Sequence, residues 1–209
     1  MKPSRIRVKM CGMTRAEDID YAVHLGVDAI GLIFYKGSKR HVTLTQARKL
    51  LHKIPVLVNV VAVLVNPEKH FVEELLNELP INTLQFHGNE SPEFCHQFNT
   101  PYIKSIHPES GSHISDMAHE FSQAGAILLD TPSATSKGGT GLTFDWSIIP
   151  DDLAKPYILA GGLNEANVRD AINSSSPYAV DVCSGIEASP GIKNHQKMSR
   201  FINALWGIT

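Results

Sequence analysis

IRVKMCGMTRAEDIDYAVHLGVDAIGLIFY, the stretch from residue 6 to residue 35, reads as one complete strand–helix–strand unit. Its two β-branched apolar runs, Ile6–Cys11 and Ala29–Tyr35, have the length and composition of buried strands. Between them, Thr14 and Glu17 have the T-x-x-E spacing of a capping box, which predicts the start of a helix. This order predicts two parallel strands that are joined by a right-handed crossover.

The same unit repeats along the whole chain. The predicted strands are Ile6–Cys11, Ala29–Tyr35, Val56–Val65, Thr83–His87, Tyr102–His107, Ala126–Asp130, Tyr157–Gly162 and Tyr178–Ser184. The predicted helices lie near 16–25, 45–53, 68–78, 92–98, 113–122, 145–149, 165–173 and 195–206. Five or six units would favour an open doubly wound sheet, whereas eight in succession predict a closed barrel. We therefore expect the α/β class, with residues 1–209 forming a single (β/α)8 barrel domain of eight parallel strands, the TIM barrel.

The composition excludes several classes of protein. The chain of 209 residues is 43% hydrophobic and has 19 Lys and Arg against 21 Asp and Glu, a formal net charge of −2. Because this charge is nearly balanced and no basic block occurs, we expect neither nucleic acid nor a membrane surface as a partner.

No segment has the features of a targeting signal or a membrane anchor. The amino terminus lacks the apolar segment of a signal peptide, and the longest strongly apolar run, Val60–Val65, is far shorter than a membrane helix. The three cysteines, Cys11, Cys95 and Cys183, are far apart, unlike a disulfide framework or a paired-cysteine metal site. We therefore expect a cytoplasmic protein.

In such a barrel the active site lies at the carboxyl ends of the strands, and the last two loops often bind phosphate. Gly161 and Gly162 end the seventh predicted strand, and Ser184 and Gly185 end the eighth. Glycines at such places let backbone N–H groups approach an anion closely. A tight turn alone would explain one such pair, but two pairs at the same rim predict a phosphate site. A further glycine-rich segment, 137–141, fits neither nucleotide-binding pattern and is interpreted as a mobile lid.

Two side chains at the same rim are candidates for proton transfer. Asp130 closes an apolar strand, where a carboxylate either caps the loop or contacts a ligand, since burying it unpaired is costly. Cys11 closes the first strand and is either a small buried hydrophobe or a reactive thiol. Composition alone favours the first interpretation of Cys11.

The alternation of side chains along the strands changes that balance for Cys11. It directs Arg7, Lys9 and Cys11 into the barrel, and it directs Asp181 of the neighbouring last strand inward as well. We therefore expect Lys9 and Asp181 to pair inside the barrel. A nearby ammonium favours the thiolate form of a cysteine, so Cys11 and Asp130 are the candidate base and acid of a proton transfer.

Arg40 and His87 are further candidates for contact with a substrate. Arg40 lies on the loop after the second strand, where its planar guanidinium suits a carboxylate; a solvated basic loop is the alternative. His87 is directed inward at the end of the fourth strand and is either a substrate contact or a hydrogen-bonded core histidine. No group of Cys and His residues has the spacing of metal ligands, so we predict no catalytic metal.

Five blocks of the sequence, in order, match one known family. They are Lys9-Met10-Cys11-Gly12-Met13-Thr14 with Glu17-Asp18; Gln85-Phe86-His87-Gly88; Leu128-Leu129-Asp130 with Gly138-Gly139-Thr140-Gly141 and Phe144-Asp145-Trp146; Ala160-Gly161-Gly162-Leu163-Asn164; and Asp181-Val182-Cys183-Ser184-Gly185-Ile186-Glu187 with Pro190-Gly191. Together they resemble the phosphoribosylanthranilate isomerase family of tryptophan biosynthesis. The sequence departs from the family pattern at Cys183, where the family usually has Ser, and at Asn194, where it has Asp.

The resemblance implies a usually monomeric barrel that needs no cofactor and catalyses the Amadori rearrangement of N-(5-phosphoribosyl)anthranilate. It implies that Asp130 is the general acid, that Cys11 is the general base, and that Arg40 binds the anthranilate carboxylate. It also implies that the two glycine loops bind the phosphate. We place His87 and Asp181 with the substrate-binding residues.

Two alternatives stay open. The first is the isomerase of histidine biosynthesis, which acts on a related aminoaldose. Resemblance to that family would imply a site with two carboxylates. Cys11 at the end of the first strand argues against it. The second is a non-catalytic barrel that binds a phosphate ligand. The presence of both a candidate acid and a candidate base argues against this one.

Overall fold

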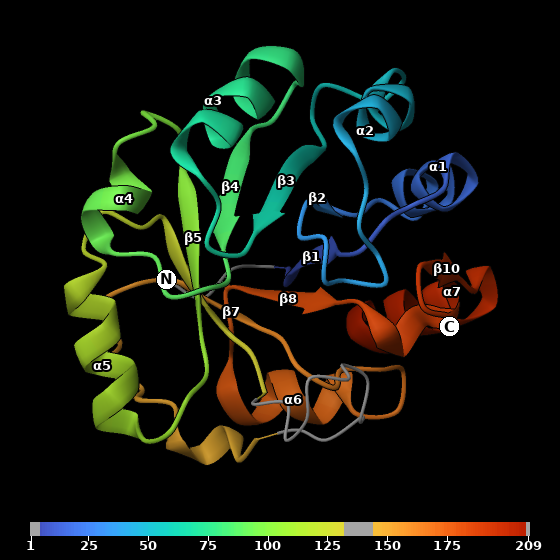
Figure 1. Cartoon of the computed structure of the whole chain (residues 1–209). Coiled ribbons are helices and arrows are strands. Elements are labelled where there is room, and N and C mark those ends of the chain that lie inside the picture. Colours follow the sequence, from blue (N-terminus) through green and yellow to red (C-terminus); the bar gives the residue numbers. More distant parts are fainter. Residues whose placement is uncertain (1–4, 132–143, 208–209) are drawn as a thin grey trace.

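The computed structural model describes residues 5–131 and 144–207 of the chain. Eight parallel strands, β1 to β8, close into a barrel in the order of the sequence (Figure 1). They are β1 Arg7–Met10, β2 Ala29–Ile33, β3 Asn59–Leu64, β4 Thr83–Phe86, β5 Tyr102–Ile106, β6 Ala126–Leu129, β7 Tyr157–Leu159 and β8 Ala179–Val182. The predicted (β/α)8 architecture is confirmed.

Helices lie outside the ring of strands (Figure 1). They are α1 Ala16–His24, α2 Leu44–Leu51, α3 Lys69–Glu78, α4 Pro92–His96, α5 Gly111–Glu120, α6 Val168–Ser175 and α7 His195–Trp206. The helix predicted at 145–149 is only a 3-10 helix, η1, Trp146–Ile148. Within the described residues, no helix is long and apolar enough to cross a membrane.

A short hairpin follows the last barrel strand. After the 3-10 helix η2, Ser184–Ile186, strands β9 Glu187–Ser189 and β10 Ile192–Lys193 pair antiparallel. Gly191, in the turn between them, has a φ of +84°, which favours glycine. The strand prediction missed this hairpin, because its two strands are too short and too polar to show as apolar runs in the sequence.

Two local predictions from the sequence are wrong. The Thr14 hydroxyl donates to the carbonyl of Gly191 in the hairpin, and α1 begins after Arg15 with no side-chain cap, so Thr14 forms no capping box. The third strand begins at Asn59 rather than at Val56, which is 94% exposed. In both cases, a tertiary contact or the surface position of the segment overrides the local pattern.

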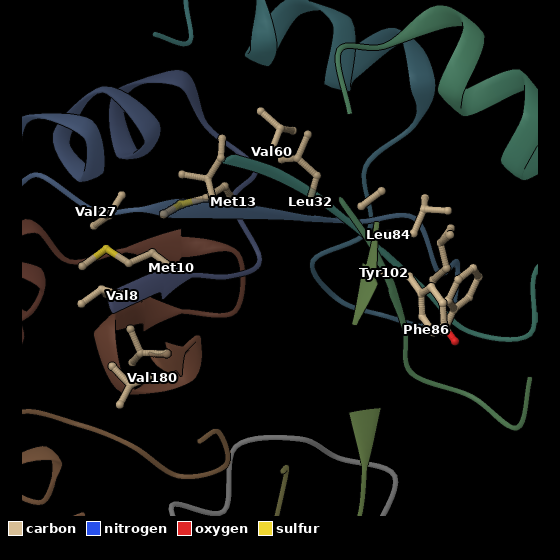
Figure 2. Packing of buried hydrophobic residues seen from close by; sticks show 14 of the residues in the cluster. Val8, Met10, Met13, Val27, Leu32, Val60, Leu84, Phe86, Tyr102 and Val180 are labelled. Carbon is tan, nitrogen blue, oxygen red and sulfur yellow. The ribbon is translucent and has the colours of Figure 1, made fainter. Parts of the chain in front are cut away.

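Alternation along the strands divides the buried apolar residues into two clusters. The larger lies between strands and helices, and Figure 2 shows Val8 and Met10 of β1 near Val180 of β8 within it. The smaller lies inside the barrel and consists of Ile103, Ala126, Leu128, Ile158, Ala160 and Ala179. Five of these residues belong to β5, β6, β7 and β8, and Ala160 directly follows β7, so the inner apolar cluster fills one part of the barrel and leaves the β1 side to polar groups.

Candidate active site

The predicted site residues lie at the carboxyl ends of the strands. Cys11 follows β1, His87 follows β4 and Asp130 follows β6. The segment 161–162 begins one residue after Ala160, past the end of β7, and Ser184 opens η2 after β8. In a closed parallel barrel these ends all meet at one mouth. The structure therefore brings the candidate acid, the candidate base and the candidate phosphate loops to the same end of the barrel.

Lys9 and Asp181 form the ion pair that strand alternation predicts. Lys9 Nζ donates to Asp181 Oδ2 over 2.9 Å, from paired positions of β1 and β8. The two side chains are only 4% and 8% exposed. Burial opposes the charge on Lys9, but the charges of Asp181 and Cys11 raise its pKa above the ordinary value. Lys9 is therefore a fixed cation beside Cys11.

Cys11 and Cys183 lie one residue past the ends of β1 and β8. The Cys11 N–H donates to the carbonyl of Val182 over 2.9 Å, which continues the strand pairing to this level. Hydrogen bonding to Cys183 and burial raise the pKa of Cys11, against the effect of Lys9. Cys11 and the neighbouring Lys193 lower the pKa of Cys183 to about 7, against burial. One sulfur of the pair therefore loses its proton much more readily than the other.

Arg40 is bound by a carboxylate of the protein itself. Its Nε and Nη2 donate to the two carboxylate oxygens of Glu187 over 2.8 and 2.6 Å. Burial opposes the charge of Glu187, but Arg40 and Lys193 hold its pKa below the usual value. The sequence did not predict this partner, and Glu187 leaves three N–H donors of Arg40 unused, two on Nη1 and one on Nη2.

Lys193 lies beside the thiol pair and was not predicted by the sequence analysis. Its side chain is fully buried, and its Nζ donates to Glu187 Oε1 over 3.0 Å. The same nitrogen lies 3.1 Å from the carbonyl oxygen and 3.8 Å from the sulfur of Cys183. A single lysine in a polar segment forms no sequence pattern from which its role could be predicted. The Pro190-Gly191 turn was the available signal, since it pairs β10 with β9 and so brings Lys193 back to Cys183.

Asp130 ends a chain of hydrogen-bonded side chains from β4. His87 Nε2 lies 3.2 Å from Asp130 Oδ2, and Gln85 Nε2 lies 3.1 Å from His87 Nδ1. Ser105 Oγ is 3.3 Å from the same His87 nitrogen. The side chains of His87 and Asp130 are 24% and 28% exposed. The acid side is therefore accessible to solvent.

A buried ion pair that the sequence did not reveal fixes the loop carrying His87. Lys104 Nζ donates to Glu90 Oε2 over 2.8 Å and to the carbonyl of Gly88 over 2.6 Å. Glu90 also accepts from the N–H groups of Gly88 and Asn66, over 3.0 and 2.7 Å. The pair therefore ties together the loops after β3 and β4.

The candidate phosphate loops turn sharply where the sequence has glycine. Gly161 and Gly162 have φ values of +79° and +65°, a left-handed backbone that favours glycine. A Cβ on Gly161 would collide with Thr131, and one on Gly185 would collide with the carbonyl of Leu163. Close packing by itself accounts for these glycines, so their role in phosphate binding stays a prediction.

The segment 137–141, interpreted above as a lid, lies outside the described residues. Within the parts of the chain that are described, no group of three or more His, Cys, Asp or Glu side chains could hold a metal ion. The described part of the mouth brings together a thiol pair, a carboxylate and several cations. These are groups that can move protons on an anionic ligand.

Comparison with known proteins identifies the family. Residues 8–204 match the family model described as N-(5'phosphoribosyl)anthranilate (PRA) isomerase. A protein of Legionella pneumophila (strain Lens) named N-(5'-phosphoribosyl)anthranilate isomerase is 66% identical over 207 residues, 99% of this chain and 100% of that protein. A protein of the same name from Pseudomonas syringae pv. syringae is 45% identical over 98% of this chain and 99% of its own length.

Solved structures of similar sequence have the same fold. The phosphoribosyl anthranilate isomerase of Thermotoga maritima gives a TM-score of 0.89 at 36% identity, over 97% of this chain and 100% of that one. A structure of such an enzyme with reduced 1-(o-carboxyphenylamino)-1-deoxyribulose 5-phosphate gives 0.86, with the same identity and coverage. A third, of monomers of the dimeric Thermotoga maritima enzyme, gives 0.85, again with 36% identity and coverage of 97% and 100%. The chain belongs to the phosphoribosylanthranilate isomerase family.

Proposed function

We propose that this chain converts N-(5-phosphoribosyl)anthranilate into 1-(2-carboxyphenylamino)-1-deoxyribulose 5-phosphate in tryptophan biosynthesis. This is the Amadori rearrangement of an aminoaldose to a ketose. The observation that carries the proposal is that a member of this family has Cys11 and Asp130 at strand ends of one barrel mouth. A relative of similar fold binds the reduced form of this product.

Asp130 is the proposed general acid. It donates a proton to the furanose ring oxygen, the bond between that oxygen and C1 breaks, and the nitrogen lone pair forms the C=N bond of a protonated Schiff base. His87, 3.2 Å from the carboxylate, is in a position to orient it. The partial exposure of Asp130 leaves room for a sugar and allows the carboxyl group to regain a proton from solvent.

Cys11 is the proposed general base. Its thiolate removes the proton from C2 of the sugar, the C–H electron pair forms a double bond between C1 and C2, and the π electrons of the C=N bond return to nitrogen to give an enolamine. Transfer of the enol proton from oxygen to C1 then gives the ketone. Lys9 supports this role, because a fixed ammonium stabilises negative charge on a buried sulfur.

Arg40, His87 and Asp181 are the proposed contacts to the rest of the substrate. Asp181 Oδ1 is buried and has no hydrogen-bond partner among the described residues, so a substrate hydroxyl would satisfy it. The Nη1 hydrogens of Arg40 suit the anthranilate carboxylate. Backbone N–H groups of the loops at 161–162 and 184–185 are the proposed phosphate ligands.

We further propose that residues 1–209 act as one barrel domain and as a monomer in the cytoplasm. Closure of all eight strands into one barrel supports the first statement. The three cysteines are free thiols, as suits a reducing compartment. Because a Thermotoga maritima relative is dimeric, light scattering in solution is the direct test. A mass of one chain is expected, and a mass of two chains would contradict the monomer.

A fluorescence assay that follows loss of phosphoribosylanthranilate tests the reaction and its base. Wild type should turn the substrate over, whereas Cys11→Ser should lose a factor on the order of 10²–10⁴, because a hydroxyl is far harder to deprotonate than a thiol. Cys95→Ala is the matched control and should keep the wild-type rate, since Cys95 lies in the outer core. A wild-type rate in Cys11→Ser would contradict the assignment of the base.

The same assay separates the alternatives. With the aminoaldose of histidine biosynthesis in place of phosphoribosylanthranilate, we expect no turnover. Turnover of that substrate alone would establish the first alternative. Tight binding of phosphoribosylanthranilate without any turnover would establish a non-catalytic binding protein.

A further inference from the structure

The candidate base has a second thiol beside it that the proposed mechanism does not use. Cys11 and Cys183 occupy neighbouring positions on adjacent parallel strands, since Met10 pairs with Val182 and the Cys11 N–H bonds to Val182. Adjacent strands lie about 4.8 Å apart, so side chains that point to the same face at one level are in contact. This register therefore places the two thiols side by side inside the barrel.

The two thiols are packed closely against their neighbours. A Cβ on Gly12 would lie 2.9 Å from Cys183 Sγ and 2.7 Å from Arg40 Cδ, so only glycine lets the sulfur and the arginine stem pack together here. Cys11 is 5% exposed, Cys183 is half-buried, and Lys193 beside Cys183 is fully buried. Fixed charges of the protein therefore contribute strongly to how many protons the two sulfurs hold.

The charges that face the pair come from five elements of the barrel mouth. The cations are Lys9 of β1, Arg40 of the loop after β2 and Lys193 of β10; the carboxylates are Asp181 of β8 and Glu187 of β9. Among the described residues 5–131 and 144–207, three cations against two carboxylates leave one positive charge in excess. One thiolate neutralises this excess, whereas two thiolates would create a buried net negative charge.

We propose that Cys11 and Cys183 hold a single proton between them, so that Cys183 is a positioning residue that prepares Cys11 as the base. Before substrate binds, the Cys11 thiol donates to the Cys183 thiolate. The proton then moves along this hydrogen bond to Cys183, and the resulting Cys11 thiolate removes the proton from C2 of the sugar. Two thiols side by side among these charges titrate as a coupled pair, so the first proton leaves more readily than the second. The inference rests on the proposed role of Cys11.

The dependence of kcat/KM on pH tests the pair in the complete, reduced enzyme. The acidic limb of wild type should report the first ionisation of the pair, near the Cys183 pKa of about 7. In Cys183→Ser this limb should move toward an ordinary thiol pKa of about 8.5, so kcat/KM falls about tenfold at neutral pH and largely recovers at alkaline pH. A purely structural role would lower the whole profile without moving its limb.

Two controls keep the outcome readable. Cys95→Ala should leave the profile unchanged, because burial raises the pKa of Cys95 to about 12, outside the relevant range. Cys11→Ser separates the two proposals. If Cys11→Ser is inactive and Cys183→Ser keeps the acidic limb of the wild-type pH profile, the shared proton is overturned and Cys11 stays the proposed base. If Cys11→Ser is fully active, the proposed base is overturned as well.

The ultraviolet absorbance of thiolates gives a second measurement that needs no turnover. Titration of wild type without substrate should show one thiolate per chain forming around pH 7, and Cys183→Ser should lack that step. Absence of any thiolate in wild type below about pH 8 would overturn the inference, even if Cys183→Ser failed to fold.

Discussion

The two sides of the candidate site hold their reactive groups in different ways. On the β1 and β8 side, Cys11 is 5% exposed and lies next to the buried Lys9–Asp181 pair. On the β4 and β6 side, Asp130 is 28% exposed and hydrogen-bonds to His87. A buried thiolate needs fixed cations in place of water, whereas an acid must exchange protons with solvent in each turnover. Mutations on the base side should therefore affect stability as well as rate, and mutations on the acid side should affect rate alone.

The largest expected effect is on the acid side. Asp130→Asn should lower kcat/KM by a factor on the order of 10²–10⁴, because an amide cannot donate the required proton, while the unfolding temperature and product binding stay near those of wild type. Fluorescence kinetics and a thermal melt measure both quantities. Asp116→Asn, an exposed position on α5, is the control for loss of one carboxylate charge. A large fall in unfolding temperature for Asp130→Asn would contradict the expected difference in stability effects between the two sides.

Substitutions on the β1 and β8 side should lower the free energy of unfolding. Lys9→Met leaves Asp181 buried without its partner, so the free energy of unfolding should fall by about 3–5 kcal/mol in urea denaturation. Arg48→Met removes an exposed ion pair with Glu78 and should cost less than about 1 kcal/mol. If the two substitutions had equal effects on stability, burial would not distinguish this side of the site.

The double variant Lys9→Met with Asp181→Leu sharpens the comparison further. It removes both buried charges, so much of the lost stability should return. Turnover should stay low, because Cys11 then lacks its neighbouring ammonium. Recovery of both stability and turnover would contradict the proposed effect of Lys9 on the thiol.

The smallest expected effect is a dependence of stability on acid pH. The pKa of Glu187 is lower in the folded protein than its ordinary value of about 4.3, so its ionised form stabilises the fold. This contribution is complete above the unfolded pKa and is lost as pH falls through the folded value. Unfolding temperatures of Glu187→Gln should therefore fall less steeply than those of wild type below about pH 5. Parallel curves would contradict the role of this carboxylate.

The architecture of the protein could be predicted from the sequence because it rests on a repeated local pattern. Eight apolar runs with period-two alternation were enough to predict the strands, the barrel and the Lys9–Asp181 pair across the β1–β8 seam. Local signals failed where a tertiary contact competed with them. Thr14 bonds to Gly191, far along the chain, instead of capping α1.

The candidate site was only partly predictable, because its charges come from elements without a periodic pattern. Glu187 and Lys193 reach Arg40 and Cys183 only after the polar β9–β10 hairpin folds back. The Lys104–Glu90 pair joins two loops whose approach depends on the closed barrel. The strand ends indicated where the chemistry lies, whereas the partners of each group required the three-dimensional structure.

The central claim is that the sulfur of Cys11 and the carboxyl group of Asp130 act on one sugar from opposite sides. A crystal structure of this protein with the reduced product tests it most directly. We predict that Sγ of Cys11 lies against C2 and that the Asp130 carboxyl group lies against the oxygen on C4, which is the ring oxygen of the substrate. A ligand that contacts neither group, or only one of them with packed side chains in between, would contradict the claim.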